Sequence, residues 1–161
     1  MYTAAALLDI HARTQRSLAR LIEHCAGFEP SELTRELAGF GYPTLAAQLD
    51  HIVGAERYWL AVLHGQTDWG AEEPVPSSAD VLSARRASVA AATRAYLETT
   101  SDAALNTPGE YTTWGGRRAT LLPARVLLRT QTHVFQHQGQ VAAMCRLLGR
   151  PIPAGLDFPL D

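Results

Sequence analysis

The chain has 161 residues and a formal net charge of −2, and it carries no run of basic residues. This pattern argues against a protein that binds nucleic acid, because phosphate backbones attract a positively charged surface. No segment approaches the ~18 apolar residues of a membrane span, and the first residues lack the basic and apolar stretches of a signal peptide. We therefore expect a soluble cytoplasmic protein, with no nucleic-acid or membrane partner, in which residues 1–161 form one domain.

The spacing of apolar residues predicts four long helices and no strong β-strand. Helices are expected near residues 3–26, 43–64, 78–100 and 120–148. Gly27, Gly65 and Gly149 follow three of them and are typical helix stops, while Pro43 suits the first turn of the second. Four such helices predict an all-α fold, an up-down four-helix bundle whose interior can hold a site built from facing helices.

The first predicted helix carries His11 and Cys25 on its inward stripe. We interpret His11 as a core or cleft histidine with a satisfied hydrogen bond rather than as a ligand. Cys25 and Cys145 belong to no Cys-x-x-Cys motif, so buried free thiols are favoured over a disulfide.

The second predicted helix has two different faces. One is aliphatic and suits the core, whereas the other places His51 beside small residues, with Tyr58 two turns later, and indicates the wall of a cleft. Glu56 falls among the aliphatic positions and needs a partner there. A structural ion pair with an arginine of the first helix is favoured over a catalytic role.

Between the third and fourth predicted helices, a β-prone run from residue 111 to 114 ends in two glycines and predicts a short extended segment or hairpin. Trp114 is interpreted as a packed lid residue. Arg117 and Arg118 offer charge for an anionic substrate group, although a solvated pair of loop residues is favoured.

His133 and His137 lie in the middle of the fourth predicted helix, on one stripe with apolar residues. Residues four apart are neighbours on a helix face, so both imidazoles can reach one object. Burying them costs free energy unless each ring nitrogen finds a partner, and a divalent metal is one such partner. A hydroxyl or carbonyl in a polar core is the alternative, and His51 on another helix offers a third metal ligand.

Two segments of the chain resemble the DinB family, part of the wider DinB/YfiT-like metalloprotein superfamily. Residues 51–65 (HIVGAERYWLAVLHG) resemble its second helix, and residues 133–151 (HVFQHQGQVAAMCRLLGRP) resemble its fourth helix and exit. With the closing Leu-Asp-Phe-Pro tail, the resemblance covers in effect the whole chain. It implies a four-helix bundle in which His51, His133 and His137 bind a divalent cation such as zinc, nickel or iron.

The resemblance also implies an activity. Family members with a known reaction are often thiol-dependent S-transferases or isomerases that use bacillithiol, mycothiol or glutathione, and many others have no assigned reaction. Dimers are common in the family, so a homodimer is expected. Members frequently carry an arginine just before the Gly-Gln pair, where this chain has Gln138, and this departure weakens any transfer of substrate detail.

Three neutral imidazoles leave open positions on a divalent ion for a thiol or for water. This chemistry supports either S-transfer or hydrolysis and does not choose between them. With what the family resemblance implies, we expect a metal-dependent enzyme acting on a small molecule, first of all an S-transferase that uses a low-molecular-weight thiol. Tyr58 and Gln140 are the candidate catalytic residues, and Gln48 is a further candidate for contact with the ligands or substrate. A metal-dependent hydrolase, a non-enzymatic metal-binding stress-related protein and a metal-free polar core are the alternatives.

Overall fold

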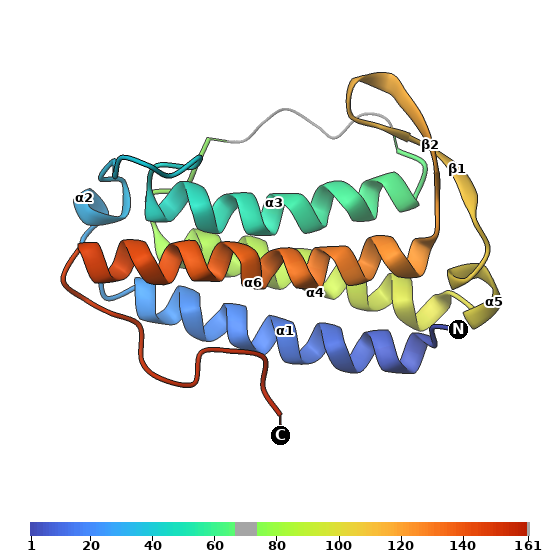
Figure 1. Ribbon diagram of the computed structural model, residues 1–161, viewed down its shortest axis with the longest axis horizontal. Coiled ribbons are helices and arrows are strands. Elements are labelled where there is room, and N and C mark those ends of the chain that lie inside the picture. Colours follow the sequence, from blue (N-terminus) through green and yellow to red (C-terminus); the bar gives the residue numbers. More distant parts are fainter. Residues whose placement is uncertain (67–73, 161) are drawn as a thin grey trace.

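Four long helices dominate the computed structural model, which describes residues 1–66 and 74–160 (Figure 1). They are α1 (Ala4–Cys25), α3 (Leu45–Leu63), α4 (Ala79–Thr99) and α6 (Pro123–Leu147). Two short helices, α2 (Pro30–Leu33) and α5 (Asp102–Leu105), lie in the connections. The prediction of an all-α four-helix bundle is confirmed. Among the described residues, no helix is long and apolar enough to cross a membrane.

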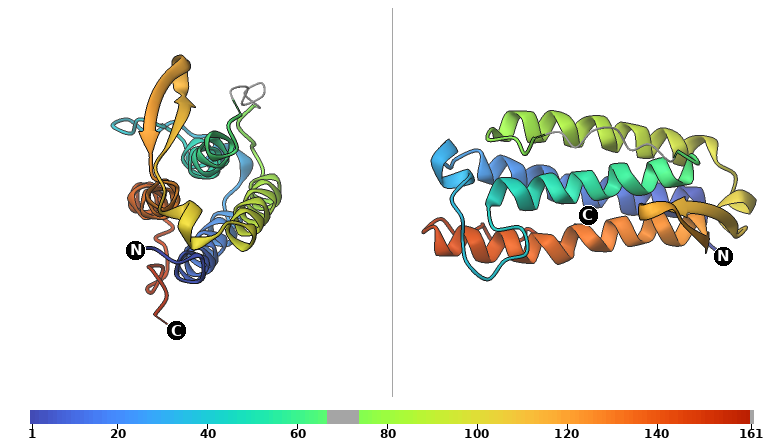
Figure 2. Two further views of the ribbon diagram at one scale, coloured as in Figure 1. Left: turned by 90° about the vertical axis from the view of Figure 1, so that its right-hand side faces the viewer. Right: turned by 90° about the horizontal axis from the view of Figure 1, so that it is seen from above.

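The packing of the four helices decides which faces meet. Seen along their axes, they occupy the corners of a square in the order α1, α4, α3, α6 (Figure 2). Helices α3 and α4 run in the same direction, whereas α1 and α6 run in the opposite one, so the directions do not simply alternate (Figure 1). Because α3 packs along α6, the helices that carry the predicted ligands are direct neighbours.

Helix boundaries depend on local capping. The second long helix begins at Leu45, two residues later than Pro43 suggested, because the Thr44 side chain accepts a hydrogen bond from the Ala47 backbone at 3.0 Å and caps the helix. The last helix begins at Pro123 and not near residue 120. The preceding residues form the second strand of a hairpin instead.

This hairpin joins β1 (Gly109–Thr113) and β2 (Arg117–Leu121), which pair antiparallel with Gly109 opposite Leu121. Between them, Gly115 and Gly116 have φ values of 69° and 73°, a left-handed conformation that suits glycine. The predicted short hairpin is therefore confirmed. It packs against α3 near the C-terminal end of that helix (Figure 1).

The core is divided into two apolar clusters by a layer of buried polar side chains. One cluster contains Leu18, Val53, Leu82 and Val134, and the other contains Leu7, Leu63, Leu97 and Leu127. The polar layer consists of the buried residues His11, Thr14, Gln15, Glu56, Thr93, Thr130 and Gln131. In each long helix, these polar residues lie between the members of the two clusters. Cys25 and Cys145 are buried free thiols in the first cluster, as predicted.

Candidate metal centre

The structure brings together the three histidines that the sequence singled out. His51 projects from α3, and His133 and His137 project from one face of α6. Their candidate ligand nitrogens all lie within 4.8 Å of one another, and the Nε2 atoms of His51 and His133 are 3.0 Å apart. His51 and His133 are half-buried, and His137 is buried.

This geometry fits a divalent metal ion. Two nitrogens bound tetrahedrally to zinc at about 2.0–2.1 Å lie roughly 3.3 Å from each other. The distance of 3.0 Å between the Nε2 atoms of His51 and His133 is close to that value. Because all candidate ligand nitrogens lie within 4.8 Å of one another, the three side chains need only small movements to bind one ion. The three-histidine cluster can therefore hold a metal ion.

The orientation of His137 is fixed by an amide. Its Nδ1 atom lies 2.7 Å from Oε1 of Gln48, an atom that only accepts hydrogen bonds. Nδ1 therefore carries the proton, and Nε2 keeps its lone pair for a metal. The Gln48 amide nitrogen in turn donates to Oε1 of Gln140 at 2.8 Å and to the Tyr42 carbonyl at 3.1 Å. These two bonds hold the amide with its oxygen toward the histidine.

We expect Gln48→Leu to weaken zinc binding by about 10- to 100-fold, the usual cost of losing a partner that orients a ligand histidine. The replacement leaves the Nδ1–H of His137 without an acceptor. Competition with a chromophoric chelator measures the affinity. Gln140→Leu is the control and should have a smaller effect, because Gln140 reaches the histidine only through Gln48. Equal affinities of Gln48→Leu and the wild type would contradict this role.

Sequence reasoning missed Tyr42. Its ring stacks on the His51 imidazole with the centroids 4.0 Å apart and an angle of 21° between the planes, and it lies 6.1 Å from the His137 ring. The side chain thus covers one side of the cluster. One sequence feature could have indicated it. Tyr42 precedes Pro43, which restricts its backbone to an extended conformation, and it lies just before the helix that supplies a metal ligand.

All three histidines favour their neutral form. Burial, followed by the neighbouring His137 and His133, lowers the pKa of His51 to about 4. Burial, followed by His137 and the positive charge of Arg129, lowers the pKa of His133 to about 4 as well. Burial also lowers the pKa of His137. Near pH 7 the cluster therefore presents unprotonated nitrogens, the form that binds metals.

We expect the metal-free protein to lose stability as the pH falls from about 6.5 to about 4. In this window the unfolded state binds protons on His51 and His133 that the folded state excludes, so acid favours unfolding. The contribution is fully present above pH 6.5 and is lost by the time the pH reaches about 4. Thermal melts in EDTA measure it. In a His51→Gln/His133→Gln double variant, the melting temperature should fall less steeply with decreasing pH. A fall as steep as that of the wild type would contradict the assignment of the pH dependence to these two histidines.

Tyr58, a candidate catalytic residue, lies at the junction of α3 and the hairpin. Its hydroxyl accepts a hydrogen bond from the Trp114 backbone at 2.7 Å and so ties the hairpin to the helix. The prediction that Trp114 is a packed lid residue is wrong, because the residue is 62% exposed. Its backbone makes the hydrogen bond to Tyr58, and its ring lies 6.5 Å from the Tyr58 ring. Arg117 and Arg118 are exposed on β2.

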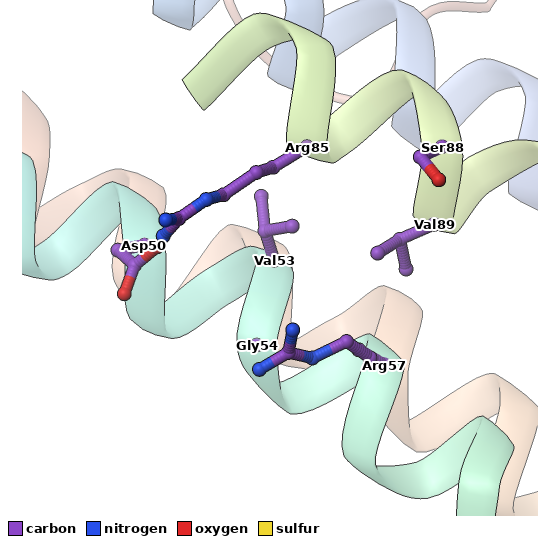
Figure 3. Close-up of a pocket in the computed structure, with 7 residues that line it drawn as sticks. All are labelled: Asp50, Val53, Gly54, Arg57, Arg85, Ser88 and Val89. Atoms are coloured by element: carbon purple, nitrogen blue, oxygen red, sulfur yellow. Dashed lines mark hydrogen bonds and ion pairs between the residues drawn. The ribbon is translucent and has the colours of Figure 1, made fainter. Parts of the chain in front are cut away.

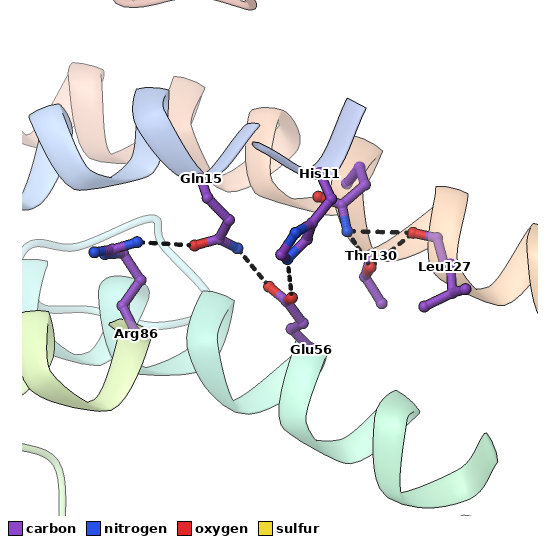
Figure 4. A network of polar contacts seen from close by, with 7 residues as sticks. His11, Gln15, Glu56, Arg86, Leu127 and Thr130 are labelled. Atoms are coloured by element: carbon purple, nitrogen blue, oxygen red, sulfur yellow. Dashed lines mark hydrogen bonds and ion pairs between the residues drawn. The ribbon is translucent and has the colours of Figure 1, made fainter. Parts of the chain in front are cut away.

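His11 and Glu56 meet in the interior, away from solvent. His11 Nε2 lies 2.9 Å from one Glu56 carboxylate oxygen, and the Gln15 amide donates to the other oxygen at 2.7 Å (Figure 4). His11 is thus a satisfied core histidine, as predicted. The expected partner of Glu56, an arginine of the first helix, is replaced by these two residues. Arg86 of α4 reaches the network only through Gln15, at 3.2 Å.

A separate cavity of about 170 Å³ lies between α3 and α4. Asp50 and Arg85 form an ion pair of 2.9 Å at its edge, and Val53, Gly54 and Val89 line it (Figure 3). None of the three histidines lines this cavity, which opens on the α4 side of α3.

Comparisons with known proteins agree with this architecture. A DinB-like protein from Bacillus cereus ATCC 10987 superposes with a TM-score of 0.77 at 23% identity, covering 96% of this chain and 99% of that one. A conserved protein from Enterococcus faecalis superposes with a TM-score of 0.68 at 15% identity, covering 93% and 99% of the two chains. No curated protein matches the chain. The sequence profile of the DinB superfamily matches residues 13–141, and the chain belongs to this superfamily.

Proposed function

We propose that this protein is a divalent-metal-dependent enzyme that joins a low-molecular-weight thiol, through its sulfur, to an electrophilic small molecule. The observation that carries the proposal is the convergence of three imidazoles, which share a preference for the neutral form, from two neighbouring helices. Three protein ligands are typical of catalytic metal sites, whereas structural zinc sites are closed by four. His51 and His133 are half-buried, which gives a small molecule access to the cluster.

The surrounding side chains have separable tasks in this proposal. Gln48 holds the His137 tautomer, and the Tyr42 ring keeps water from one side of His51. The amide oxygen of Gln140 accepts a hydrogen bond from Gln48, so the N–H groups of Gln140 are the donors that we propose contact the substrate. Tyr58 is the second proposed substrate contact. A bound divalent ion would supply the remaining chemistry by favouring the thiolate form of a thiol at its open position.

The reaction to be tested joins a thiol to a chlorinated aromatic electrophile. A carbon–sulfur bond forms, the carbon–chlorine bond breaks, chloride leaves, and the thiol proton passes to solvent. The metal-loaded protein should consume glutathione, bacillithiol or mycothiol faster than the His133→Ala variant does, as followed by spectrophotometry. Elemental analysis of protein purified without added metal or a histidine tag identifies the ion.

The same screen separates the alternatives. If the metal-loaded wild type consumes none of the three thiols faster than the His133→Ala variant does, the transferase proposal is contradicted. Ester or amide cleavage by the metal-loaded protein in that case would favour a hydrolase. Metal binding without either reaction would favour a metal-binding protein that is not an enzyme.

A further inference from the structure

Arg129 lies beside the histidine cluster and contacts the same two helices. It precedes His133 by one turn of α6, so the two side chains project from one face of the helix. Its guanidinium carbon lies 5.1 Å from the centre of the Trp59 ring, which belongs to α3. A guanidinium over an indole is attracted to the ring face, and this contact gives the long side chain a defined position.

Among the described residues, the guanidinium of Arg129 has no hydrogen-bond acceptor. In the described parts of the chain, no carboxylate or carbonyl contacts its guanidinium, whereas Arg13 pairs with Asp9 and Arg85 pairs with Asp50. Arg129 is exposed. A guanidinium offers five N–H donors in a planar fork that matches a carboxylate. The position therefore presents an unused anion-binding group on a side chain that Trp59 holds in place.

The charge of Arg129 acts on the cluster itself. After burial and His137, it is the third cause that lowers the pKa of His133, so the guanidinium is within electrostatic range of that ring. Arg129 precedes His133 by about one helical turn, a backbone rise of roughly 5.4 Å, so a small molecule bound at the histidines would meet this positive charge toward the N-terminal end of α6. Carboxylates of small thiols lie a few bonds from the sulfur and can span such a distance.

Aromatic side chains gather on the Trp59 side of Arg129. The Tyr58 ring lies 5.0 Å from the Trp59 ring and 6.5 Å from the Trp114 ring. At the opposite end, Tyr42 covers His51. The two ends thus differ in charge, with the cation of Arg129 at one end and a neutral ring at the other, and this difference can orient an acidic ligand.

We propose that Arg129 is a specificity-determining residue that binds a carboxylate of the thiol substrate. The inference rests on the proposed function and narrows it to thiols with an acidic group. Glutathione and bacillithiol carry carboxylates, whereas mycothiol has none. The protein therefore prefers the first two thiols to the third.

The test measures binding without turnover. Calorimetry with S-methylglutathione, on protein saturated with zinc, should show that Arg129→Gln binds about tenfold more weakly than the wild type, because a charge-assisted contact is lost. Arg125→Gln is the matched control, since Arg125 is another exposed arginine one turn earlier on α6, and it should bind like the wild type. The diethyl ester of the probe lacks carboxylates, so its affinity should not respond to Arg129→Gln.

The outcomes separate this inference from the proposed function. Equal binding of S-methylglutathione by Arg129→Gln and the wild type would overturn the role of Arg129, even if the enzyme consumes thiols. The absence of binding to the wild type would overturn it too. A selective loss in Arg129→Gln with no thiol consumption by the wild type would support the carboxylate site and contradict the transferase.

Discussion

Replacing His133 with alanine is expected to weaken zinc binding by more than about a hundredfold while the bundle remains folded. Losing a ligand should cost more than losing a partner that only orients one, for which 10- to 100-fold is usual. The fold should persist because His133 is half-buried and belongs to neither apolar cluster. Chelator competition measures the affinity, and circular dichroism with thermal melting measures the fold.

His64→Ala is the control for this experiment. His64 follows α3, is exposed, and lies outside the three-histidine cluster, next to the Tyr96 ring at 5.3 Å. It should bind zinc as tightly as the wild type. If His133→Ala did so as well, the three histidines would not be the metal site. If instead it unfolded, His133→Gln would provide the test with a side chain that keeps more of the packing.

The histidine cluster was predictable because its geometry follows from helix periodicity. A spacing of four residues places His133 and His137 on one face of any regular helix. His51 required one further step, the pairing of α3 with α6, which the family resemblance implied and periodicity alone did not. The helices themselves were predictable for the same reason, and their ends differ by more than one residue only where Thr44 caps one helix and the hairpin replaces the start of another.

The surroundings of the cluster depend on contacts that no local pattern encodes. Tyr42 reaches His51 from a connection between helices, and its position follows from the path of that connection. Glu56 was expected to find an arginine because a buried carboxylate needs a strong partner. Its partners, His11 and Gln15, lie on the first helix in the same layer of the bundle. Which residues share a layer depends on how the helices are offset along their axes, and a single sequence does not specify that offset.

The polar layer is expected to be sensitive to the loss of one member. Glu56 and His11 have side chains only 4% and 6% exposed, and the Glu56 carboxylate accepts hydrogen bonds from Gln15 as well as contacting His11. Within the layer, His11, Gln15 and Glu56 form a connected set, whereas the hydroxyls of Thr14 and Thr93 and the amide oxygen of Gln131 have no hydrogen-bond partner among the described residues. Buried polar groups are costly unless each is satisfied, so the connected set depends on all three of its members. The layer also opposes any shift of one helix along the others, because such a shift would place polar groups against the apolar clusters.

We expect Glu56→Leu to lower the free energy of unfolding by about 3–5 kcal/mol, the usual cost of removing one partner from a buried pair. The substitution leaves His11 and Gln15 without their acceptor. The triple variant His11→Leu/Gln15→Leu/Glu56→Leu should recover part of this loss, because it removes both groups that Glu56→Leu leaves without an acceptor. The recovery is incomplete because Arg86 then loses its contact with Gln15. Urea unfolding measures both. A Glu56→Leu variant as stable as the wild type would show that the network contributes little, and a triple variant less stable than Glu56→Leu would show that packing, and not the unpaired groups, sets the cost.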